Sequence, residues 1–98
     1  MLLKNKKGLI MGVANEKSAA WGIAAIAAEQ GADLAFTYQI EGFRKRLAPL
    51  ASSVGSDFLI PCDVAEETAA QKTFAAIRTR WDALDFVVQP LGFQIRVS

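Results

Sequence analysis

The sequence contains no histidine and only one cysteine in 98 residues. Cys62 alone cannot close an internal disulfide, and without histidine few ligands remain for a structural zinc site. No apolar run approaches the ~18 residues that a membrane span needs, and the amino-terminal segment offers no signal-peptide cleavage site. We therefore expect a soluble, cytoplasmic protein without a disulfide or a structural metal.

The sequence also lacks an excess of charge of either sign, because 11 basic and 10 acidic residues leave a net charge of +1. This balance argues against a nucleic acid or an anionic membrane as partner. Hydrophobic residues make up 52% of the chain, which is apolar enough to build a folded core. A chain of this length fits one compact unit, so we predict a single domain over residues 1–98.

Short apolar runs alternate with segments of helical periodicity. The runs at 8–13, 33–38, 58–62 and 84–88 are typical of buried strands. Helical spacing of apolar residues predicts helices over 18–30, 43–54 and 66–81, with Glu66 and Glu67 in the first turn of the last one. Pro49 lies inside the second helix, so we expect a kink or a break near Ala48. Gly31 stands where a helix ends in a left-handed residue.

This alternation predicts an α/β fold with parallel strands joined by right-handed crossovers. The order β-α-β-α-β-α-β is the first half of a doubly wound parallel sheet, in which the second and third strands lie on one side of the first and the fourth lies on the other. A ligand crevice is then expected between strands one and four. Residues 89–98 show no periodicity and are predicted to be a loop, which leaves the edge of the fourth strand open.

The turn after the first strand has the context of a phosphate-binding site. Gly12 permits a close approach of the backbone, Ser18 can donate its hydroxyl, and the following helix presents free amides. The spacing is unusual, because Gly12 and Gly22 stand ten residues apart rather than within six. From these residues alone, a tight turn at Gly12 with Ser18 as a simple helix cap explains the pattern equally well.

The other chemically suggestive residues are better explained by packing or solvation. Tyr38 belongs to the second strand and should form a core or crevice-wall ring. Asp63 and Asp85 belong to different strand ends and do not form a carboxylate pair for acid–base catalysis. We expect packing roles for Trp21, Trp81 and Cys62, and a solvated helix face for Arg44, Lys45 and Arg46.

Five segments together closely resemble one protein family. They are residues 12–18 (GVANEKS), 20–24 (AWGIA), 31–39 (GADLAFTYQ), 61–64 (PCDV) and 85–88 (DFVV), which occur in register between about Lys7 and Val88. The family is the enoyl-acyl-carrier-protein reductase of bacterial fatty acid synthesis, a divergent branch of the short-chain dehydrogenases with a Rossmann-type fold. The resemblance implies NADH-dependent reduction of the trans-2 double bond of an acyl chain on acyl carrier protein, and a homo-oligomeric full-length enzyme.

The resemblance also implies which residues contact the cofactor. Gly12, Ser18 and Ala19 fall on the diphosphate region and Gln39 on the adenosine ribose. Asp63 and Val64 fall on the adenine, and Leu91 with Gly92 on the segment after the fourth strand. Ala19 replaces a bulkier residue, which leaves backbone contacts intact. The neutral amide of Gln39 does not by itself distinguish NAD from NADP, and the family favours NADH.

This chain departs from the family in two respects, and both affect the activity that we expect of it. Residues 89–98 form a divergent tail, in which Pro90 removes one backbone amide beside the crevice. The family's catalytic tyrosine and lysine correspond to no residue here, so no catalytic residue is predicted. We expect an enzyme fragment that holds the cofactor half and is inactive alone. The alternative is a stand-alone nucleotide-binding or interaction module that pairs through its open sheet edge.

Overall fold

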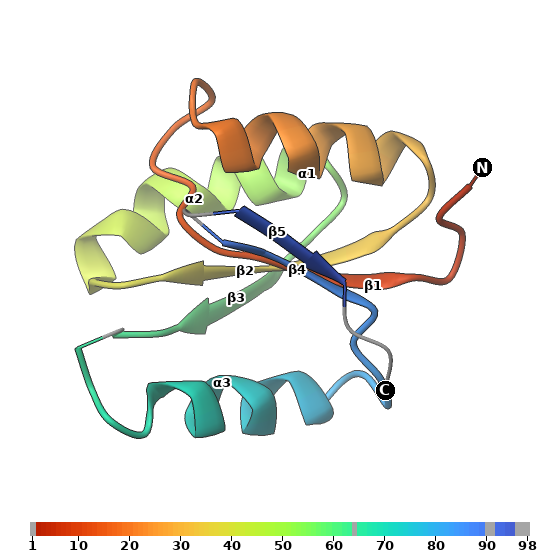
Figure 1. Cartoon of the computed structure of the whole chain (residues 1–98). Coiled ribbons are helices and arrows are strands. Elements are labelled where there is room, and N and C mark those ends of the chain that lie inside the picture. The colour runs from red at the N-terminus through yellow and green to blue at the C-terminus, as the bar shows by residue number, and fades with distance from the viewer. Residues whose placement is uncertain (1, 64, 90–91, 96–98) are drawn as a thin grey trace.

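The computed structural model describes residues 2–63, 65–89 and 92–95, which form one sheet with helices on both faces (Figure 1). The elements are β1 (Lys7–Ile10), α1 (Ala19–Glu29), β2 (Asp33–Tyr38), α2 (Glu41–Ser53), β3 (Phe58–Pro61), α3 (Ala69–Arg78), β4 (Phe86–Gln89) and β5 (Gly92–Ile95). The strand order is β3-β2-β1-β4-β5, with β1 to β4 parallel. The predicted half of a doubly wound sheet is confirmed. No helix within the described ranges is long and apolar enough to cross a membrane.

Alternate residues of the buried strands supply two cores, one on each face of the sheet. Leu9 of β1 pairs with Val87 of β4, and both belong to the core on the α3 side. The next residue, Ile10, pairs with Phe36 of β2 and with Val88, in the core beneath α1 and α2. Burial on both faces explains why the strands read as continuous apolar runs.

Helix α1 lies within one residue of its predicted range and packs closely on the sheet. The amide of Gly31, at φ +94°, donates to the carbonyl of Ala28, and the amide of Ala32 donates to that of Ala27. This pair of bonds is the Schellman arrangement that the left-handed residue permits, so the predicted helix end is confirmed. The buried face consists of small residues: Ala20, Ala24 and Ala27.

Helix α3 begins later than the sequence predicted. Glu66 and Glu67 lie in the preceding turn, where the amide of Glu66 donates to the carbonyl of Asp63. These turn bonds occupy the backbone groups that a longer helix would have used. Ala70 is exposed, and Trp81 lies beyond the helix. The buried positions are Ala69, Thr73 and Ile77.

Helix α2 runs through Pro49, so of the kink or break predicted near Ala48 the break does not occur. Both Pro49 and Lys45, whose carbonyl loses its intrahelical donor, are exposed. Water can therefore satisfy that carbonyl. Leu47 and Ala51, on either side of the proline, are fully buried against the sheet and hold both halves of the helix in place.

The predicted loop after β4 is also wrong in part, because the chain returns as β5, antiparallel to β4. Gly92 pairs with Gln89, and Ile95 pairs with Phe86. The edge of β4 is therefore occupied rather than open. A four-residue strand has too short a pattern for period-based prediction.

Gly8→Ala should destabilise the sheet, because a Cβ at this position would lie 2.2 Å from the ring of Phe86. Overpacking of this kind costs about 1–3 kcal/mol in the free energy of unfolding, which urea titration by circular dichroism measures. Gly22→Ala is the matched control, since its Cβ meets nothing within 4 Å. This substitution should raise the free energy of unfolding by about 1 kcal/mol, because alanine favours the helix more than glycine does. Wild-type stability of Gly8→Ala would contradict the packing of Phe86 on β1.

Pro49→Ala should stabilise the chain by about 1–3 kcal/mol, because it restores the donor to the carbonyl of Lys45 within α2. The same urea titration measures the gain. Ser52→Ala, also exposed on α2, is the control and should change stability by less than about 0.5 kcal/mol. A loss of stability on Pro49→Ala would show that α2 needs the proline ring.

Candidate functional site

The turn between β1 and α1 lies at the carboxyl end of the central strand. The amide of Met11 still donates to the carbonyl of Val88 at 2.8 Å, but Gly12 at φ +81° turns the chain away. The strand therefore ends at Ile10, three residues before its predicted end. A glycine at this φ avoids the strain that a Cβ would bring and leaves the backbone open to a ligand.

Ser18 stands at the N-cap of α1, but its hydroxyl does not cap the helix. The Oγ accepts hydrogen bonds from the amides of Ala14 at 3.0 Å and Asn15 at 3.2 Å. The hydroxyl thus closes the turn, and its own proton remains for an outside acceptor. Of the two explanations given for Ser18, the simple side-chain cap does not hold.

The first amides of α1 are open. Those of Ala19 and Ala20 make no hydrogen bond within the described residues, while the carbonyl of Ser18 accepts from Trp21 and Gly22. The first turn also contains no acidic residue. Free amides and the positive end of the helix dipole favour an anion at this position.

A cavity of about 250 Å³ lies beside this turn, at the carboxyl ends of β1 and β2. Two predicted cofactor contacts line this cavity: Gly12, assigned to the diphosphate, and Gln39, assigned to the adenosine ribose. Tyr38 forms part of its wall and is 9% exposed, so the predicted wall role is confirmed. Cys62 is buried and also lines it.

The remaining predicted contacts follow β3 and β4. Asp63 is exposed directly after Cys62, and its Oδ1 accepts from the amide of Ala65 at 3.0 Å. Gly92 is the first residue of β5. Val64 and Leu91 lie outside the described residues. The structure therefore brings five predicted contacts to the carboxyl end of the parallel strands: Gly12, Ser18, Ala19, Gln39 and Asp63.

Sequence reasoning missed part of the cavity wall. Phe43 of α2 is 40% exposed and lines the cavity with Thr37. Phe43 lies two residues after the start of α2 and four residues after Gln39 in the sequence. This closeness to Gln39 was the available signal for a place in the cavity wall. An aromatic ring at a cavity mouth can cover a flat ligand.

The packing explanation is confirmed for the two tryptophans, and the solvation explanation is confirmed for the basic residues of α2. The rings of Trp21 and Phe36 lie 6.1 Å apart, and those of Phe58 and Trp81 lie 5.1 Å apart in an edge-on arrangement. The basic run Arg44, Lys45 and Arg46 is exposed on α2.

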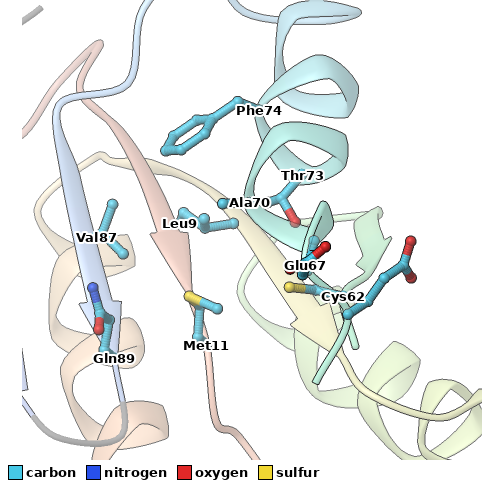
Figure 2. Close-up of a pocket in the computed structure, with 11 residues that line it drawn as sticks. Leu9, Met11, Cys62, Glu67, Ala70, Thr73, Phe74, Val87 and Gln89 are labelled. Atoms are coloured by element: carbon cyan, nitrogen blue, oxygen red, sulfur yellow. The ribbon is translucent and has the colours of Figure 1, made fainter. Parts of the chain in front are cut away.

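A second hollow, which we call the α3 groove, has a volume of about 370 Å³ and lies on the opposite face of the sheet (Figure 2). Its lining includes Leu9 of β1 and Met11 just after it, Val87 and Gln89 of β4, and Thr73 and Phe74 of α3. Glu66 and Glu67 lie at its mouth. A hydrogen bond from Lys72 lowers the pKa of Glu66 below its ordinary value, with further contributions from the Thr68 hydroxyl and the charge of Lys72.

The carboxylates of Asp63 and Asp85 lie far apart in the sheet. Asp85 lies at the other end of the sheet from Asp63, where its carboxylate accepts from the amide of Lys7 at 2.8 Å. The two carboxylates therefore cannot act together, as predicted. No group of three or more potential metal ligands occurs among the residues that the structure describes. The carboxyl ends of the strands offer backbone amides together with the side chains of Ser18, Gln39 and Asp63.

Comparison with known proteins places these residues in a family. The family's sequence model, described as enoyl-(acyl carrier protein) reductase, matches residues 12–98. The enoyl-[acyl-carrier-protein] reductase [NADH] 2 of Rhizobium meliloti is 56% identical over 92 residues, which cover 94% of this chain and 34% of that protein. The corresponding reductase of Rickettsia typhi is 41% identical and is covered to 35%.

Solved structures agree with this relationship. The FabI of Candidatus Liberibacter asiaticus superposes with a TM-score of 0.85 at 55% identity, covering 89% of this chain and 34% of that one. The reductase of Anaplasma phagocytophilum, described as a complex with NAD, gives a TM-score of 0.85 at 49% identity, covering 90% and 34%. The chain spans about a third of the length of these relatives, and it belongs to the enoyl-(acyl-carrier-protein) reductase family.

Proposed function

We propose that this chain forms the NADH-binding part of an enoyl-[acyl-carrier-protein] reductase. The observation that carries the proposal is the turn from Gly12 to Ser18, which the Ser18 hydroxyl closes and which leads into the open amides of α1. This turn borders the cavity lined by Gln39. Relatives whose names specify NADH, and one solved as a complex with NAD, support the choice of cofactor.

The residues present fit a dinucleotide. The diphosphate would lie against Gly12, Ser18 and Ala19, where open amides and a free hydroxyl proton complement its negative charge. The ribose would lie at Gln39, which can both donate and accept hydrogen bonds. We assign the adenine to Asp63 and Val64, and a further contact to Leu91 and Gly92.

The whole reaction requires more than this chain provides. When bound, the nicotinamide supplies a hydride to the trans-2 double bond of the acyl substrate. The chain's own residues bind and orient the cofactor, while the tyrosine and lysine that the family uses have no counterpart here. Tyr38 is a buried residue of the cavity wall. In the proposed role, the chain contributes binding and orientation but not the stabilisation of the enolate.

Gly12→Val should raise the dissociation constant for NADH at least tenfold, because a branched side chain would block the approach of the diphosphate to the backbone. Titration of the purified chain, followed by quenching of Trp21 and Trp81 fluorescence, measures the constant. Gly55→Val is the matched control, since Gly55 has a similar φ of +79° and its Cβ would meet nothing within 4 Å. Equal affinities of the three proteins, or no saturable binding by the wild type, would refute the assignment.

The chain alone should not oxidise NADH in the presence of a crotonyl thioester. Loss of one hydrogen-bond donor to a developing oxyanion costs about 3 kcal/mol or more, and here the entire catalytic set is absent. Absorbance at the nicotinamide band, compared with a control without protein, measures turnover. Activity that survives rigorous removal of host reductase would assign a catalytic role to residues described here as structural.

A further inference from the structure

Phe43 is a large apolar side chain in the first turn of α2, and it belongs to neither core of the sheet. It shares a helix face with Leu47 and Ala51, because residues four apart on a helix lie one above the other. Leu47 and Ala51 are buried against the sheet, whereas Phe43 is 40% exposed. Phe43 therefore lies on the inner face of α2 without being fully covered by the residues that the structure describes.

The place of α2 in the fold explains this exposure. β2 ends at Tyr38, and α2 begins at Glu41 beside the carboxyl end of the strand (Figure 1). The first turn of α2 thus lies at the strand ends, where the cavity of about 250 Å³ opens. Five large apolar side chains are exposed in the described ranges, and of these Phe43 alone lines the cavity. Its exposed surface is therefore part of a cavity wall.

The cavity suits one half of a dinucleotide. Pockets that enclose a whole small ligand commonly measure roughly 300–1,000 Å³, and this one is smaller. Gln39, the proposed contact of the adenosine ribose, lines the cavity. Cys62 lines it as well, and the next residue along the chain is Asp63, the proposed adenine contact. Phe43 is thus grouped with the proposed contacts of the adenosine half.

We propose that Phe43 is a specificity-determining residue for the cofactor, and that its ring packs against the adenosine of NADH. This proposal deepens the proposed function and rests on it. A purine nucleoside presents a flat surface, which an aromatic ring covers better than an aliphatic side chain does. The contact also removes the exposed part of the ring from water, which favours binding.

The test compares NADH binding by the wild-type chain and by three variants, using titration followed by tryptophan fluorescence. Phe43→Ala should raise the dissociation constant about tenfold, an effect typical of removing an aromatic ring that stacks on a base. Phe43→Tyr should bind within about twofold of wild type, because it keeps the ring. Phe43→Leu should bind nearly as weakly as Phe43→Ala, because leucine is apolar but not flat.

Ile23→Ala is the matched control for these variants. Ile23 is a large apolar residue of α1 with a similar exposure of 37%, and it does not line the cavity. Its substitution should leave the dissociation constant for NADH unchanged. The urea midpoint of Phe43→Ala should also match that of wild type, since the residue lies outside both cores. A role of Phe43 in stability alone would lower that midpoint instead.

A second measurement reports on contact with the base. AMP carries adenosine and one phosphate but no nicotinamide. Saturating AMP should quench the additional tryptophan emission of Phe43→Trp, because the base stacks on the indole ring. The additional emission of Ile23→Trp should not change, because position 23 does not line the cavity.

Three results would overturn the proposal and leave the cofactor assignment intact: equal NADH affinities of Phe43→Ala and wild type, full affinity of Phe43→Leu, or unchanged emission of Phe43→Trp at an AMP concentration that displaces NADH. Absence of saturable NADH binding by the wild-type chain would instead overturn the proposed function, and this inference with it. The two failures are therefore distinguishable.

Discussion

β1 is hydrogen-bonded on both sides, to β2 and to β4, and the rest of the molecule depends on this double pairing. Because every crossover is right-handed, pairing on both sides places α1 and α2 on one face and α3 on the other. It also brings the turn at Gly12 to the point where the chain direction reverses, which is where doubly wound sheets bind ligands. Gly8 allows the close contact with Phe86 that joins β1 to β4.

The candidate site uses backbone more than side chains. The amides of Ala19 and Ala20 do not depend on a particular side chain, which is why alanine at position 19 is compatible with the site, whereas the positive φ of Gly12 favours glycine. Ser18 is the exception, because its hydroxyl fixes the shape of the turn by accepting two amide hydrogen bonds. A site built in this way is sensitive to the path of the chain and tolerant of changes in its side chains.

The parts of the fold that could be predicted from sequence are those set by local pattern. Buried strands, the range of α1 and the left-handed Gly31 all follow from apolar runs, periodicity and glycine position. α2 could not be predicted in full, because solvation of the Lys45 carbonyl and burial of Leu47 and Ala51 outweigh the proline. β5 has no pattern of its own and depends on its pairing with β4. For the site, the position of the turn and of Gln39 follows from the strand ends, but the place of Phe43 in the cavity wall arises from tertiary packing.

The two outer strands of the sheet differ in how they meet solvent. At β3, the amide of Cys62 points inward to the carbonyl of Tyr38, so the neighbouring Pro61 points its nitrogen outward, where it has no hydrogen to donate. β5 forms the other border and carries no such block in its described backbone. The missing donor interrupts the outward row of β3, so a strand added at this border would lack a hydrogen bond at Pro61.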